Sequence, residues 1–170
     1  KSLVRCRYSL IKTRSKYSVA ITNTLDAIFP EFKPFFNHTL TKTALYIIEN
    51  YPSAEKISRL TTASYSKIKG AAHGQFSADK FAKLKQLAKD SVGQSNEFLE
   101  TELLLNIRIF KNIDSEISKL EKQITEIVHQ VNPHFLTIKG MGVITAATIL
   151  AECGDIHNFP NADKLLAFAG

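Results

Sequence analysis

Apolar residues recur at helical spacing along most of the chain, and proline and glycine interrupt the pattern at intervals. From Ser2 to Phe29 the apolar positions lie on one helical face, and Pro30 and Pro34 end this run. Shorter helical patterns follow over residues 37–50, 53–60, 62–69 and 78–91. The pattern predicts an all-α protein in which a long first helix leads into a small helical module.

The most regular pattern lies between Gln94 and Val131. Its apolar seam alternates in steps of four and three, at Leu99, Leu103, Asn106, Phe110, Ile113, Ile117, Leu120, Ile124, Ile127 and Val131. Such a heptad repeat is what a coiled coil requires, because its seam must be buried against a partner helix. We therefore expect a helical bundle with a long antiparallel coiled-coil pair. Its expected interface is Leu103, Asn106, Phe110, Ile113, Ile117, Leu120 and Ile124.

The partner of this long helix is left open by the pattern. The helix from Ser2 to Phe29 has a similar face, so an antiparallel pair within the chain is natural, with the module at its tip. Pairing between two chains gives a homodimer, and both arrangements can hold together. Asn106, the polar seam member, either fixes the register or marks a bent section.

Serine and threonine precede several of these helices. Ser53, Thr62, Ser77 and Ser95 stand just before helical runs, where a hydroxyl can accept a hydrogen bond from a free backbone amide. We expect them to be N-caps rather than catalytic nucleophiles.

Positive charge is concentrated near the N-terminus. The chain has a net charge of +6, and six basic residues precede its first acidic one, Asp26: Lys1, Arg5, Arg7, Lys12, Arg14 and Lys16. On a helix, Arg5, Lys12 and Lys16 share one face, with Tyr8 and Tyr17 interleaved, and such a stripe suits phosphates. Arg5, Arg7, Lys12 and Arg14 are thus candidate nucleic-acid contacts, the alternative being a solvated or packed face.

A second basic stretch runs from Ser53 to Lys89. Its eight basic residues face two acidic ones; they are Lys56, Arg59, Lys67, Lys69, Lys80, Lys83, Lys85 and Lys89. Such a cluster gives salt-sensitive binding to nucleic acid, although lysines at helical spacing also serve to solubilise a surface.

A short glycine motif follows the long helix. Gly140 and Gly142 lie between that helix and the apolar run from Val143 to Leu150, which is the pattern of a helix-hairpin-helix. Glycine permits the tight turn and lets amides at the next helix start approach a phosphate. Lys139 and Thr145 can add a charge and a hydroxyl, so Lys139, Gly140, Gly142 and Thr145 are candidate nucleic-acid contacts. The alternative is a turn that contacts no ligand.

The run from Lys139 to Gly170 carries a family resemblance. It contains Gly-x-Gly, a Thr-Ala-Ala helix, a Glu-x-Gly-Asp-Ile turn at Glu152 to Ile156, Phe159-Pro160 and a helix ending in Ala169-Gly170. This order resembles the start of the C-terminal domain of DEDD-type insertion-sequence transposases, a family that includes RNA-guided recombinases.

The resemblance implies a protein of three parts: a nuclease domain with four acidic residues, a helical coiled-coil region and a C-terminal domain with a catalytic serine. Because the chain begins at Lys1 without methionine and ends within the motif, we expect it to be a piece of a longer protein. The acidic residues would then precede Lys1 and the serine would follow Gly170, so no catalytic residue is assigned here. Any divalent metal belongs to the nuclease domain.

The expected segments are a basic arm and helical module at 1–94, a long coiled-coil helix at 95–135 and a helix-hairpin-helix at 136–170. No cofactor or metal is expected in them, since Cys6 and Cys153 form no CxxC pair. No apolar run is long enough for a membrane span, and a cytoplasmic setting is expected.

Three hypotheses follow. The first is that the chain binds DNA or guide RNA and takes part in assembly during DNA transposition and recombination. The second is a dimerisation scaffold without direct nucleic-acid contact. The third, an autonomous enzyme, lacks a site, because Glu152, Asp155 and Asp163 are better explained as turn and cap residues.

Overall fold

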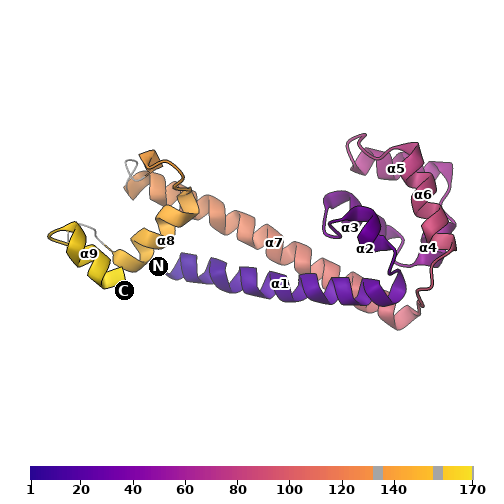
Figure 1. The fold of residues 1–170 in the computed structure, drawn as a ribbon, viewed down its shortest axis with the longest axis horizontal. Coiled ribbons are helices and arrows are strands. Elements are labelled where there is room, and N and C mark those ends of the chain that lie inside the picture. The colour runs from indigo at the N-terminus through magenta and orange to yellow at the C-terminus, as the bar shows by residue number, and fades with distance from the viewer. Residues whose placement is uncertain (132–135, 155–158, 170) are drawn as a thin grey trace. The chain divides into compact units, whose positions relative to one another are not determined.

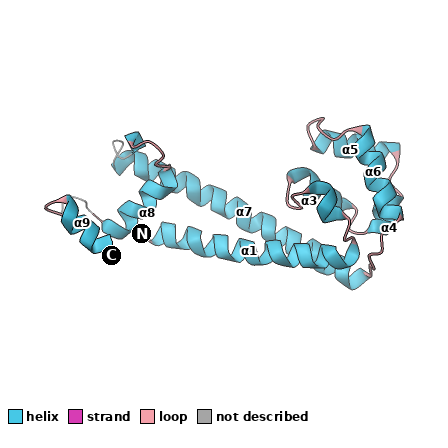
Figure 2. Cartoon of the chain, in the orientation of Figure 1, coloured by secondary structure: helices cyan, strands magenta, loops and turns pink. Residues whose placement is uncertain are grey.

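The computed structural model describes residues 1–131, 136–154 and 159–169, and within these ranges the regular structure is helical, without strands (Figures 1 and 2). The helices are α1 (Ser2–Ile28), α2 (Phe32–Phe36), α3 (Lys42–Asn50), α4 (Ala54–Ser58), α5 (Thr62–Ala71), α6 (Ala78–Lys89), α7 (Glu97–Val131), α8 (Val143–Cys153) and α9 (Ala162–Ala169). The predicted all-α class is confirmed. None of the described helices is both long and apolar enough to cross a bilayer.

The chain forms two compact units whose boundaries fall inside α1 and α7. The terminal unit comprises Lys1–Lys12 and Asp114–Gly170, and the central unit comprises Thr13–Ile113. The predicted division at residues 94 and 135 follows the sequence pattern instead, and it stays a prediction. Its boundary at 135, and the last two residues of the predicted turn, Asp155 and Ile156, lie outside the described residues.

The core of the central unit joins the end of α1, the short helices and the start of α7. Ile21, Ile28, Ile47, Leu84 and Ile107 are each fully buried within it. Within the module, α4 and α2 both pack on α6, and α3 packs on α5. Gln94 N donates to Ala27 O at 3.0 Å, so the chain entering α7 lies beside the last turn of α1.

Two of the predicted N-caps are confirmed and two are displaced by one residue. Ser53 and Ser77 accept hydrogen bonds from the amides of Lys56 and Lys80. Before α5 the cap is Thr61 rather than Thr62. Before α7, Asn96 Oδ1 accepts from the Leu99 amide at 2.9 Å, so Ser95 is not the cap. In both corrected cases the side chain one residue away has the same capping chemistry, which spacing alone does not separate.

The sequence analysis missed a short helix that contains the second proline. Pro34 was predicted to end the first helical run, but it lies within α2, whose first turn has backbone amides that need no partner inside the helix. Asn37 was predicted to begin the following helix, yet its φ of 56° places it in the turn after α2. Thr41 caps α3 instead. The helical pattern over residues 62–69 continues in the structure through Gly70, which lies inside α5, and Gly74, with φ of 81°, follows the end of that helix.

The terminal unit has its own small core. Ile124 and Val128 of α7 are buried with Ala146 and Ala147 of α8. Leu3 and Val4 of α1 and Leu136 and Met141 of the connecting segment pack around them. Arg7 of α1 contacts Glu121 of α7, so within this unit the start of α1 runs antiparallel to the end of α7 (Figure 1).

The buried stripe of α7 differs in register from the predicted seam. Of the predicted interface residues, Leu103, Phe110, Ile117 and Ile124 are buried, whereas Asn106, Ile113 and Leu120 are half-buried. The stripe is completed by Ile107 and Val128, which are 0% and 3% exposed. Ile127 and Val131, also expected in the seam, are 45% and 67% exposed. From Leu103 and Ile124 the stripe thus advances by four residues rather than three. After Phe110 and Ile117, the residues three and four positions on are all half-buried.

Candidate nucleic-acid interface

The predicted hairpin turn lies between the end of α7 and the start of α8 in the terminal unit. The Met141 amide donates to Ile138 O at 3.0 Å, which closes a tight turn. Gly140 occupies it with φ of 88°, a conformation that side-chain-bearing residues rarely adopt. The conformational argument for glycine therefore applies at Gly140.

Gly142 has a different role. Its φ of −77° and ψ of 155° are open to any residue, and a Cβ there would find its nearest neighbour, Thr145 Oγ1, at 4.0 Å. Gly142 is the N-cap of α8 and has no side chain to bond the first amides of the helix. What glycine provides at this position is an uncovered helix start.

The four predicted hairpin residues gather at this helix start. Lys139, Gly140, Gly142 and Thr145 are all exposed. The buried side of α8 carries Ala146 and Ala147, whose small side chains allow close packing on α7. The sequence thus separates a packed face from an exposed N-terminal end, where an anion would meet the positive end of the helix dipole. Contact with phosphate stays a prediction.

The C-terminal end of α8 is tied to the start of α1. Glu152 accepts hydrogen bonds from Arg5 Nε and Nη2, each at 3.4 Å, and Lys1 Nζ lies 3.0 Å from Glu152 Oε2. Hydrogen bonds from Lys1 and then Arg5 hold the pKa of Glu152 below its ordinary value. Glu152, expected to be a turn or cap residue, is therefore an ion-pair partner of two members of the basic arm.

The other candidates on α1 lie in different surroundings. Arg7 is half-buried and pairs with Glu121, with Nη2 2.6 Å from Oε1. Lys12 is exposed, and its Nζ lies 4.7 Å from the ring centroid of Tyr8. Arg14 is half-buried. Of these three, Lys12 presents its charge most openly to a ligand.

The basic residues of the central unit also differ in how they are engaged. Lys56 pairs with Glu100, and Arg59 pairs with Glu55. Desolvation acts to raise the pKa of Glu100, but hydrogen bonds from Lys56, Ser95 and Ser53 outweigh it, and the net shift is downward. Lys56 and Arg59 therefore contribute to intrachain ion pairs.

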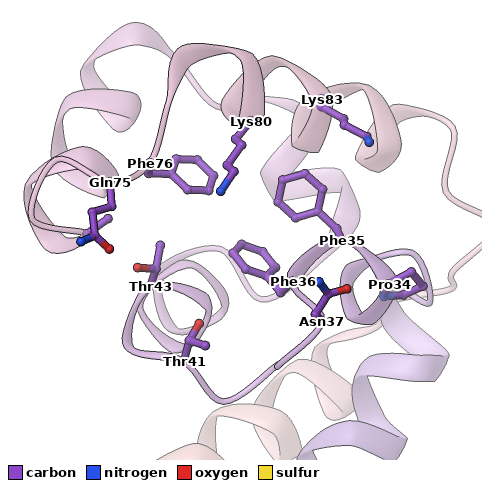
Figure 3. Close-up of a pocket in the computed structure, with 11 residues that line it drawn as sticks. Pro34, Phe35, Phe36, Asn37, Thr41, Thr43, Gln75, Phe76, Lys80 and Lys83 are labelled. Carbon is purple, nitrogen blue, oxygen red and sulfur yellow. The ribbon is translucent and has the colours of Figure 1, made fainter.

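Lys80 and Lys83 of α6 border a pocket of about 530 Å³, shown in Figure 3. Phe35, Phe36 and Phe76 lie on its walls. This grouping of aromatic rings with lysines was missed by the sequence reasoning, which assigned Lys80 and Lys83 to a basic stretch without their aromatic neighbours. The phenylalanine-rich run from Phe29 to Phe36 was the signal available in the sequence.

Metal-ligating side chains do not gather in threes in the part of the chain that the structure describes. Asp163 is exposed in the first turn of α9. Asn161 caps that helix by accepting from the Lys164 amide at 3.0 Å. Neither residue has the surroundings of an acid/base group, and no catalytic role is assigned to them.

Comparison with known proteins gives one family. The family model described as Transposase IS116/IS110/IS902 family matches residues 132–170, which include the Gly140 turn, α8 and α9. The match supports the resemblance to an insertion-sequence transposase. Searches of curated proteins and of solved structures found no match to the chain.

Proposed function

Since residues 132–170 match the model of an insertion-sequence transposase family, we propose that the chain binds DNA through its hairpin during transposition. The observation that carries the proposal is the uncovered N-terminal end of α8 at Gly142, with exposed Lys139 and Thr145 beside it, inside the matched segment. Backbone amides at such an end suit phosphate, and a lysine adds charge.

The basic arm is the second part of the proposal. Lys12 supplies an exposed charge, while Lys1 and Arg5 hold the arm against Glu152 and Arg7 holds it against Glu121. Arg5, Arg7 and Lys12 belong to the same unit as the hairpin, whereas Arg14 and Lys16 belong to the central unit. Arg7 then acts by fixing the helix, and Lys12 by attracting phosphates.

The finer parts of the proposal rest on the family resemblance. We propose a DEDD-type protein whose nuclease and serine chemistry, with any divalent metal, belongs to residues other than those of this chain. Guide RNA is proposed as a second nucleic-acid partner, a homodimer as the assembly, and the cytoplasm as the setting in which DNA is met.

The test is fluorescence anisotropy of labelled duplex DNA and of structured RNA, titrated with the chain across a salt series. Gly142→Val is the matched probe, because the backbone at this position accepts a side chain and the added bulk covers the start of α8. Gly140→Val is the contrasting variant, since its φ of 88° makes the change one of fold.

Salt-dependent binding that Gly142→Val weakens, without loss of helicity, supports the proposal. Full-strength binding by Gly142→Val contradicts the role of the hairpin. If neither nucleic acid binds at low salt, the alternative of a dimerisation scaffold stands, and it requires light scattering to show a dimer.

A further inference from the structure

The pocket of the central unit combines features that no proposed role yet uses. It lies between the segment from Pro34 to Thr43, the loop before α6 and α6 itself (Figure 3). Its volume of about 530 Å³ is within the range of roughly 300–1,000 Å³ typical of small-molecule sites. All of its lining residues belong to the central unit.

Three phenylalanines form the apolar walls. Phe36 and Phe76 lie nearly parallel, with an interplanar angle of 11° and ring centroids 6.3 Å apart. Phe35 meets Phe36 edge to face, at 78° and 4.8 Å. Phe76 is buried, whereas Phe35 and Phe36 are half-buried and leave part of their surface to solvent at the pocket. Accessible aromatic faces of this kind are platforms on which a flat ring can stack.

Two lysines border the same space. Lys80 and Lys83 are one helical turn apart on α6 and are exposed, and in Figure 3 the Lys80 side chain points toward the space between Phe76 and Phe35. Within the part of the chain that the structure describes, neither lysine pairs with a carboxylate. Their charge is therefore available to an anionic ligand, unlike that of Lys56.

Polar groups complete the lining. Asn37 and Gln75 are exposed and stand at the rim, and each amide offers both donors and an acceptor. A ligand with a flat aromatic ring, hydrogen-bonding edges and a negative charge matches all three kinds of wall. A nucleotide has these features together.

We propose that this aromatic–lysine pocket binds a single unpaired nucleotide of a nucleic-acid strand. The base lies against Phe35, its edge meets the amides of Asn37 and Gln75, and the backbone phosphates lie at Lys80 and Lys83. Stacking on an aromatic platform tolerates every base, so the site selects unpaired strand over duplex rather than one sequence. The inference rests on the proposed function, which makes nucleic acid the ligand. It places a second nucleic-acid contact in the central unit, whereas the hairpin belongs to the terminal unit.

The test compares labelled single strands by anisotropy with the whole chain: oligothymidylate, oligouridylate and an abasic strand of equal length. The abasic strand keeps the phosphates and lacks the bases. We expect the base-bearing strands to bind more tightly than the abasic one by roughly 5- to 100-fold, the usual effect of base stacking. The deoxyribose and ribose arms show whether DNA or RNA is the preferred source of the nucleotide.

Variants assign the effect to the pocket. Phe35→Leu removes the ring but keeps apolar volume, and should abolish the preference over the abasic strand. The double variant Lys80→Gln with Lys83→Gln should lower the salt slope on single strands by about 1.4. Lys122→Gln, at an exposed position of α7 outside both basic stretches, controls for loss of charge and should leave the preference unchanged. If Phe35→Leu does not fold, the lysine variants still test the site, because both positions are exposed.

Equal affinity for abasic and base-bearing strands would overturn the inference, as would an oligoglutamate peptide that competes as well as oligothymidylate. The outcome is separable from that of the proposed function. If duplex binding depends on Gly142 but base-bearing and abasic single strands bind equally, the pocket proposal fails and the hairpin proposal stands. If Phe35→Leu removes the preference for base-bearing strands while Gly142→Val leaves duplex binding unchanged, the pocket proposal is supported and the hairpin proposal fails.

Discussion

Arg7 on α1 contacts a single carboxylate oxygen of Glu121 on α7, with Nε 2.8 Å and Nη2 2.6 Å from Oε1. The two side chains are 23% and 37% exposed, so the pair is partly shielded from water. Ion pairs in such a setting are screened less than exposed ones. This arginine therefore has a structural partner before any ligand is considered.

The first prediction concerns the stability of the terminal unit. Arg7→Met should lower the free energy of unfolding by about 1–2 kcal/mol, because it leaves Glu121 without its charged donor. Urea denaturation followed by circular dichroism measures this. Arg5→Met is the comparison, since Arg5 is 65% exposed and its pair with Glu152 is screened by water, and it should shift the urea midpoint much less than Arg7→Met.

A double-mutant cycle with Glu121→Gln separates the pair from general effects of each substitution. If Arg7→Met and Glu121→Gln add without coupling, the contact does not stabilise the unit. The same variants matter for binding studies, because neutralising Arg7 changes the fold as well as the charge. Lys12→Gln is the better probe of phosphate attraction by the arm.

Glu121 illustrates why the buried side of α7 was only partly predictable from hydrophobicity. The predicted seam runs three residues on from Leu103 and Ile124, to Asn106 and Ile127, whereas the path through the buried Ile107 and Val128 also contains Glu121. A glutamate paired with arginine can occupy a half-buried position, and that pairing involves a residue more than a hundred positions away. The shared positions, such as Leu103 and Ile117, were predictable because both paths contain them.

The sequence predicted local features of the fold better than it predicted tertiary contacts. Ser53, Ser77 and the turn at Gly140 were predicted correctly, since capping and positive φ depend on a few neighbouring residues. The pocket was not predicted, because Phe35 and Lys80 are distant in sequence and their proximity depends on how α2 packs on α6. Apolar periodicity assigned Lys80 to the helical pattern over residues 78–91 and assigned Phe35 to no helix.

The second prediction concerns Gly93, at the entry to α7. A Cβ there would overlap Ile28 O and lie 2.6 Å from Ile28 C, a clash with backbone that side-chain rotation does not relieve. Gly93→Ala should therefore lower the free energy of unfolding by about 2–3 kcal/mol. Thermal or urea unfolding measures the change.

Gly70 provides the matched substitution. It lies inside α5 with nothing within 4 Å of an added Cβ, so Gly70→Ala should raise the free energy of unfolding by about 0.5–1 kcal/mol. Equal effects of the two alanines would show that the approach of Gly93 to Ile28 is not a constraint on the fold.

The third prediction is a dependence of stability on pH. Glu31 accepts hydrogen bonds from Ser91 Oγ at 2.6 Å and from the Val92 amide at 3.3 Å. Desolvation acts to raise the pKa of Glu31, but these bonds and one from its own backbone outweigh it, and the pKa is lowered. A carboxyl with a lowered pKa stabilises the fold above its unfolded pKa, and this contribution is lost as pH falls through the folded value.

As the pH falls below about 4.5, the ordinary pKa of this group, the free energy of unfolding of Glu31→Gln should consequently decrease less than that of the unsubstituted chain. Ser91→Ala should raise the pKa of Glu31 in an NMR titration of its side-chain carboxyl carbon. Glu126→Gln, at an exposed position of α7, controls for the loss of one charge. If Ser91→Ala leaves the pKa of Glu31 unchanged, the Ser91 hydroxyl does not stabilise the Glu31 carboxylate.

The last prediction separates stability from binding at the start of α8. Asp and Asn both cap helices better than glycine, so Gly142→Asp and Gly142→Asn should each raise the free energy of unfolding by a few tenths of a kcal/mol. Asp also places a negative charge where the proposed phosphate would lie, at a cost of roughly 1 kcal/mol across about 4 Å of water. Gly142→Asp should then bind duplex DNA roughly five- to tenfold more weakly than Gly142→Asn. Anisotropy at fixed salt, beside urea denaturation of the same samples, gives both quantities. If the two variants bind alike, no phosphate approaches this helix start, and the hairpin acts only as a turn.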